Sequence, residues 1–153
     1  MSATNGGLRV LVVDDETAIR RYLRVSLQAH GHTVYEAASG QAAVNAAISQ
    51  RPDLVILDLV LPDLDGIQVT RMLREWTQIP VVMISVSDRE SDIIAALDAG
   101  ADDYLTKPFS LNELLARMRV AFRRASLSAL EPVFSILDLD DDLGRLDRHL
   151  RLL

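Results

Sequence analysis

The stretch DLVILDLVLPDLDGI, residues 53–67, carries the pattern that decides the fold. Its apolar run, residues 54–57, predicts a strand buried on both faces, as in the middle of a parallel sheet. The run ends at one carboxylate, Asp58, and a turn rich in proline, aspartate and glycine follows. Burial of a carboxylate costs several kcal/mol without a compensating partner, so we expect such partners beside Asp58.

Apolar runs and helical patterns alternate on either side of this stretch. Strands are predicted at residues 8–13, 33–37, 54–57, 81–85 and near 104–105, and helices at 16–29, 40–50, 67–76, around 93–99 and at 111–124. Five strands alternating with five helices predict an α/β fold, a doubly wound parallel sheet covered on both faces. In the flavodoxin-like strand order 2-1-3-4-5, ligands bind beyond the carboxyl ends of the strands.

The size and composition of the chain limit its function. The 153 residues fit one ordinary domain with a modest appendage, and 49% hydrophobic residues suffice for a packed core. A net charge of −6 gives no argument for nucleic-acid binding, and the absence of cysteine excludes disulfides and zinc–thiolate sites. We expect residues 1–7 to be a short, polar and flexible leader. Without a signal peptide or a long apolar segment, we expect a cytoplasmic location and no membrane insertion.

Three acids are predicted to meet at one edge of the sheet. Asp14 and Asp15 end the first strand, Asp58 ends the third, and these strands are neighbours in the expected order. Like charges this close repel each other unless a cation neutralises them. Singly, each acid also fits a solvated strand end or a helix cap. Together they favour a hard divalent cation with oxygen ligands, and Mg²⁺ is usual where phosphate is involved.

A hydroxyl and an ammonium end the fourth and fifth strands. Ser85 closes the run VVMIS, and Lys107 follows DYLT. Facing three acids and a cation, these two groups could hold the oxygens of a phosphoryl group. Taken alone, Lys107 also fits a surface lysine, Ser85 a helix cap, and Tyr104 an ordinary half-buried aromatic residue.

Four motifs in this order resemble the receiver domains of bacterial two-component response regulators. They are VLVVDDE, DLVILDLVLPDLDG, PVVMIS and AGADDYLTKPF, within residues 8–124. The resemblance implies a CheY-like receiver domain over that range. It also implies a signalling phosphoacceptor rather than an enzyme, with Asp58 taking a phosphoryl group from a sensor histidine kinase.

The resemblance further implies a role for each residue around Asp58. Mg²⁺ would be bound by Asp15, by Asp58 and by the backbone carbonyl of Val60, with Asp14 acting through water. In the same way, the resemblance assigns contacts with the phosphoryl oxygens to Lys107 and Ser85, and a switching movement to Tyr104. The Lys107–Pro108 peptide bond is expected to be cis, as in the family.

The residue two positions after Asp58 bears on the lifetime of the phosphorylated state. Water that attacks the phosphoryl group needs a polar side chain to orient it, and the aliphatic Val60 cannot do this. We therefore predict slow autodephosphorylation, which suits control of transcription.

The sequence motif ADDYLTKPF and a last helix with a basic end resemble the OmpR/PhoB subfamily. Its members form homodimers on phosphorylation through the fourth helix, fifth strand and fifth helix. The residues implied are an apolar centre of Ile94 and Leu97 and, across the two-fold axis between the protomers, the ion pairs Asp103–Arg117 and Asp102–Arg124. One departure is Ile93, which stands where the subfamily usually has a lysine.

The end of the chain resembles the beginning of another domain. Residues 125–132 are predicted to be a linker, and residues 133–153 resemble the opening strands of a winged-helix DNA-binding domain, cut short. No recognition helix follows, so DNA would be bound only through the missing part of a longer parent protein.

Three alternatives share parts of this pattern. A flavodoxin-like electron carrier has the same architecture, but the first loop, DDETA, is acidic where a flavin phosphate requires amides and hydroxyls. A phosphatase of the haloacid dehalogenase type would have its nucleophile on the first strand in a DxD pattern. A pseudo-receiver that only binds partners is the third alternative.

Overall fold

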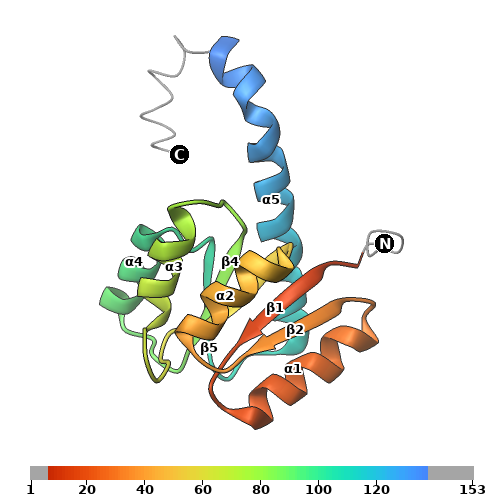
Figure 1. Cartoon of the computed structure of the whole chain (residues 1–153), viewed down its shortest axis with the longest axis vertical. Helices are drawn as coiled ribbons and strands as arrows, with labels where there is room; N and C mark the ends of the chain where they lie inside the picture. The colour runs from red at the N-terminus through yellow and green to blue at the C-terminus, as the bar shows by residue number, and fades with distance from the viewer. Residues whose placement is uncertain (1–6, 138–153) are drawn as a thin grey trace. The chain divides into compact units, whose positions relative to one another are not determined.

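The computed structural model describes the backbone of residues 7–137 and the side chains of residues 7–127 (Figure 1). The strands are β1 (Arg9–Val13), β2 (Thr33–Ala37), β3 (Leu54–Asp58), β4 (Val81–Ser85) and β5 (Asp103–Thr106). The helices are α1 (Thr17–Ala29), α2 (Gly40–Gln50), α3 (Gly66–Arg74), α4 (Glu90–Ala99) and α5 (Leu111–Leu137). All strand pairs are parallel, in the order β2-β1-β3-β4-β5, which confirms the predicted fold.

The sheet separates two apolar cores. On one face, buried residues of α2, α3 and α4 pack against the sheet, and on the other face those of α1 and α5 do. Every residue of β3 and β4 is buried, because both strands are covered on both sides. Each fully buried Leu or Ile side chain contributes roughly 1.5–3 kcal/mol. This rigid centre holds the ends of β1, β3 and β4 in place.

Local signals in the sequence set several helix ends. Ser39 caps α2 by accepting a hydrogen bond from the Ala42 backbone N–H, and Asp65 forms a capping box with Gln68 at the start of α3. Helix α4 ends at Gly100, whose φ of 116° lies in the left-handed region.

The predicted end of the last helix, near Arg124, is wrong. Helix α5 continues to Leu137: the segment ASLSALE, residues 125–131, contains neither glycine nor proline and is compatible with a helix, and Pro132 falls within the helix rather than ending it. Residues 133–137, expected to begin a strand, are helical, and the rest of the predicted DNA-binding segment lies outside the described residues.

The chain divides into two structural units, with the boundary between residues 122 and 123. The predicted division into a receiver domain, a linker and a truncated winged-helix segment stays a prediction. Within residues 7–137, no helix combines the length and the apolar character that a membrane span requires.

Candidate functional site

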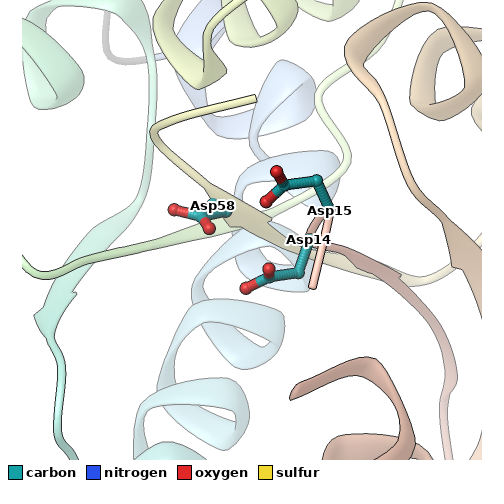
Figure 2. Close-up of side chains that lie close together, drawn as sticks. All are labelled: Asp14, Asp15 and Asp58. Carbon is teal, nitrogen blue, oxygen red and sulfur yellow. The ribbon is translucent and has the colours of Figure 1, made fainter. Parts of the chain in front are cut away.

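Three aspartates meet at the carboxyl edge of the sheet. Val13 of β1 lies beside Leu57 of β3, so the residues that follow them, Asp14 and Asp58, are brought together. Figure 2 shows the carboxylates of Asp14, Asp15 and Asp58 projecting to the same side from neighbouring strand ends, and one oxygen from each lies within 4.8 Å of the others. The predicted convergence of the acids is therefore observed.

Asp14 is completely buried, and each of its carboxylate oxygens accepts a hydrogen bond. Its Oδ1 accepts a hydrogen bond from the Glu16 backbone N–H at 2.9 Å, and its Oδ2 accepts one from Lys107 Nζ at 3.0 Å. The Asp15 side chain, in contrast, is exposed. Asp14 is therefore held in the wall of the site, while Asp15 presents its carboxylate to the open side.

Asp58 is 6% exposed and shares Lys107 with Asp14. Its Oδ2 lies 3.1 Å from Lys107 Nζ, and its Oδ1 accepts a hydrogen bond from the Val60 backbone N–H at 3.2 Å. Burial and the charge of Asp14 raise the pKa of Asp58 to about 6, and the opposing effects of Lys107 and Val60 do not cancel them. The compensating partners expected beside Asp58 are thus present in Lys107 and the Val60 backbone N–H, but they do not fully offset the cost of burying its charge.

Lys107 is the cation of the site. Burial alone would lower the pKa of Lys107, but the hydrogen bonds and charges of Asp14 and Asp58 raise it, so the side chain stays an ammonium. Three carboxylates against one ammonium leave a formal charge of −2, which one divalent cation would neutralise. The Lys107–Pro108 peptide bond is cis, as expected.

Ser85 and Tyr104 are connected through Ser87. The buried Ser85 Oγ accepts a hydrogen bond from the Ser87 backbone N–H at 3.0 Å, and the Tyr104 hydroxyl donates one to the Ser87 carbonyl at 2.8 Å. The Ser87 hydroxyl in turn donates to Asp92 Oδ2 in α4 at 2.5 Å. Ser87, two positions beyond Ser85, therefore links the end of β4 to Tyr104 of β5 and to Asp92 of α4.

A pocket of about 240 Å³ opens over the acids. Its lining residues are Asp15, Glu16, Asp58, Val60, Ser85, Val86 and Lys107. Val60 is 64% exposed, so an aliphatic side chain stands at the mouth of the pocket. A second, mostly apolar pocket of about 390 Å³ lies beside Lys107, Pro108 and Phe109.

The residues predicted for a dimer face lie on α4, on β5 and the residue just before it, and on α5. Ile94 and Leu97 are 49% and 44% exposed, as an apolar contact surface requires. Arg117 forms an ion pair of 3.2 Å with Asp103 of its own chain. The predicted exchange of this pair between protomers stays a prediction.

Asp102, the other predicted acid of the dimer, is engaged within the chain. Its Oδ2 lies 3.1 Å from the Arg74 guanidinium and accepts a hydrogen bond from the Val81 backbone N–H at 2.8 Å. Its predicted partner Arg124 is exposed. A contact between Asp102 and an Arg124 of a second copy would have to compete with Arg74.

Comparison with known proteins identifies relatives for most of the chain. The family model of the response regulator receiver domain matches residues 10–119. The KDP operon transcriptional regulatory protein KdpE of Escherichia coli (strain K12) is 53% identical over 136 residues, which is 88% of this chain and 60% of that protein. The response regulator MprA of Mycobacterium ulcerans (strain Agy99) is 46% identical over 138 residues, which is 90% of this chain and 60% of that protein. The chain spans about 60% of the length of these two relatives.

Solved structures of response regulator receiver domains have the same fold as this chain. The BeF3-activated N-terminal receiver domain of Klebsiella pneumoniae RstA superimposes with a TM-score of 0.73 at 32% identity, covering 75% of this chain and 98% of that one. The receiver domain of the Francisella response regulator 1452 gives a TM-score of 0.73 at 33% identity, covering 77% and 98%.

Proposed function

Because the chain belongs to the family of response regulator receiver domains, we propose that Asp58 accepts a phosphoryl group from the phosphohistidine of a sensor histidine kinase. One observation carries the proposal: Asp58 is a nearly buried carboxylate in contact with Lys107 and within reach of two further acids. With a pKa of about 6, Asp58 is largely ionised at neutral pH and is available as a nucleophile. A bond forms between a carboxylate oxygen and phosphorus as the phosphorus–nitrogen bond of the kinase breaks.

The acidic pocket fits Mg²⁺. Its donors are carboxylate oxygens, which hard cations prefer, and the formal charge of −2 on the three aspartates and Lys107 together matches one divalent ion. We assign Asp15, Asp58 and the carbonyl of Val60 as direct ligands and Asp14 as a ligand through water. When bound, the ion neutralises negative charge that gathers on the phosphoryl oxygens.

The residues of the chain supply position and charge. Lys107 now forms hydrogen bonds with Asp14 and Asp58. On phosphorylation its ammonium group would exchange the bond to Asp58 for one to a phosphoryl oxygen and keep the bond to Asp14. Ser85 would donate its hydroxyl to a phosphoryl oxygen. Since Ser87 links Ser85 to Tyr104 and to Asp92, a shift of Ser85 would disturb Tyr104 and the first turn of α4.

The proposal is tested by mass spectrometry of the intact protein after incubation with acetyl phosphate. The wild-type protein should gain one phosphate, labile in acid and in base and removed by hydroxylamine, when Mg²⁺ is present and none when the ion is chelated. The Asp58→Asn variant should gain none. An adduct on the variant would refute the assignment of Asp58, and a wild-type protein without an adduct would favour the pseudo-receiver alternative.

Val60 should make the phosphorylated state long-lived. We expect a Val60→Asn variant to lose its phosphate about 10-fold faster, because an amide at the pocket mouth can orient the attacking water. The decay of the intact-mass adduct after removal of acetyl phosphate measures the rate. Val60→Ile serves as the control, and equal decay of both variants would contradict the role of Val60.

The role of the longer parent protein is part of the proposal. KdpE of E. coli is named a transcriptional regulatory protein. We propose that phosphorylation controls dimerisation through α4, β5 and α5, and that a C-terminal domain of the parent then binds DNA. The exposed Ile94 and Leu97 support this choice of face.

A further inference from the structure

Arg20 of α1 lies outside the acidic pocket but holds the backbone beside it. Its Nη1 donates a hydrogen bond to the carbonyl oxygen of Asp14 at 2.8 Å. Its Nε donates to Glu36 Oε1 of β2 at 3.1 Å, and the side chain is only 16% exposed. Arg20 thus joins the first two strand ends to the start of α1.

We propose that Arg20 is a positioning residue of the metal site, which fixes the backbone of Asp14 and Asp15 so that the Asp15 carboxylate faces Asp58. The inference rests on the magnesium site proposed above and assigns it a further residue. Arg20 would contact neither the ion nor the phosphoryl group.

Asp15 depends on its backbone for its position. Its carboxylate makes no hydrogen bond or ion pair with any residue between 7 and 127, yet an oxygen of it lies within 4.8 Å of the other two acids. Asp15 follows the last residue that the sheet holds, since the Asp14 backbone N–H still bonds to the Ala37 carbonyl at 3.2 Å. The hydrogen bond from Arg20 fixes the other side of Asp14, at the peptide unit that leads into Asp15.

Glu36 in turn orients Arg20. It accepts hydrogen bonds from Arg20 and, at 2.6 Å, from Arg24 Nη1, and its pKa is lowered by these two arginines. Arg24 lies one helical turn beyond Arg20 and shares Glu36, but only Arg20 also binds the carbonyl of Asp14. Arg24 therefore provides a matched control, with the same charge and the same partner but without contact to the site.

The loss of the positive charge and the loss of the backbone anchor predict opposite changes in cation affinity for Arg20→Ala. Loss of a nearby positive charge alone would strengthen cation binding slightly. Loss of the anchor at Asp14 would leave Asp15 in several orientations and weaken cation binding. Outer groups that orient metal ligands typically change the affinity 10- to 100-fold when they are removed.

The experiment is a calorimetric titration of Mg²⁺ into the wild-type protein and the variants Arg20→Ala, Arg24→Ala and Arg20→Lys. We expect the dissociation constant to rise about 10-fold for Arg20→Ala, to stay within about twofold of wild type for Arg24→Ala, and to recover in part for Arg20→Lys. Urea unfolding without Mg²⁺ should show a loss of stability for both alanine variants, because each removes one partner of Glu36, and a larger loss for Arg20→Ala, because only Arg20 also bonds to the Asp14 carbonyl.

Two results would overturn the inference while the wild-type protein binds Mg²⁺. One is an unchanged or tighter dissociation constant for Arg20→Ala, and the other is an equal loss of affinity in both alanine variants. A wild-type protein that does not bind Mg²⁺ would instead refute the proposed metal site, and this inference with it.

Discussion

An Asp58→Asn variant is expected to be more stable than the wild-type protein in metal-free buffer at neutral pH, by up to about 3 kcal/mol. The ordinary pKa of Asp58 is 3.8, and the folded protein raises it to about 6; each pKa unit corresponds to about 1.4 kcal/mol. The folded protein therefore holds an ionised Asp58 against burial and the charge of Asp14. An amide at this position removes that cost and leaves Lys107 paired with Asp14.

The pH dependence gives the sign of the effect. Between roughly pH 4 and pH 6, the folded protein binds more protons at Asp58 than the unfolded chain does, so the free energy of unfolding falls as the pH rises. Above pH 6 the full cost is present. The advantage of the Asp58→Asn variant should thus be largest above pH 7 and should shrink toward zero near pH 4.

Urea unfolding of both proteins at several pH values measures this difference. Asp15→Asn is the control, because the Asp15 carboxylate is exposed to solvent and its replacement removes no buried charge. Mg²⁺ should stabilise the wild-type protein more than the Asp58→Asn variant, since the ion offsets the same charge. A variant that is less stable than wild type, or a difference that does not change with pH, would contradict this description of Asp58.

A Gly66→Ala variant should lose about 3 kcal/mol of stability, at the upper end of the cost of overpacking a core. A Cβ atom at Gly66 would lie 2.6 Å from the Asp58 carbonyl oxygen and 2.7 Å from Met83 Sδ, both inside van der Waals contact. Within a helix the same exchange ordinarily stabilises by 0.5–1 kcal/mol, so the expected sign is reversed. The start of α3 would have to move away from the end of β3.

The control for Gly66 is Gly31→Ala. Gly31 has open space around it, so an alanine there would meet no neighbouring atom. Its φ of 88° lies in the left-handed region, which costs an alanine roughly 1–2 kcal/mol. Urea unfolding compares the two variants, and Mg²⁺ affinity shows whether displacement of Asp58 reaches the site. A Gly66→Ala variant as stable as the wild-type protein would show that α3 and β3 are not in rigid contact.

The sequence was sufficient to predict the fold and the centre of the site. Apolar runs ending in Asp14 and Asp58 determine both the strands and the edge where their acids meet, because parallel strands align their carboxyl ends. The positions of Ser85 at the end of β4 and of Lys107 after β5 follow from the same rule. The structure places Lys107 at hydrogen-bond distance from Asp14 and Asp58, and Ser85 lines the same pocket.

Contacts between distant segments could not be read from the sequence. Arg20 and Glu36 are ordinary surface residues by pattern, and only the pairing of β1 with β2 brings them to the backbone of Asp14. Asp102 was predicted to be available to a second copy, but the fold places Arg74 beside it. The predicted end of α5 near Arg124 is wrong because residues 125–131 carry no stop signal, and the helix runs on through Pro132.

The most direct test of the central claim is to trap the acyl phosphate and locate it in the chain. The wild-type protein is phosphorylated with acetyl phosphate and Mg²⁺ and reduced with borohydride, which converts an aspartyl phosphate to homoserine, and peptides are then sequenced by mass spectrometry. We predict homoserine at position 58 and at no other aspartate. Homoserine at position 14 or 15, or an unmodified Asp58 in a phosphorylated protein, would contradict the proposed role of this pocket.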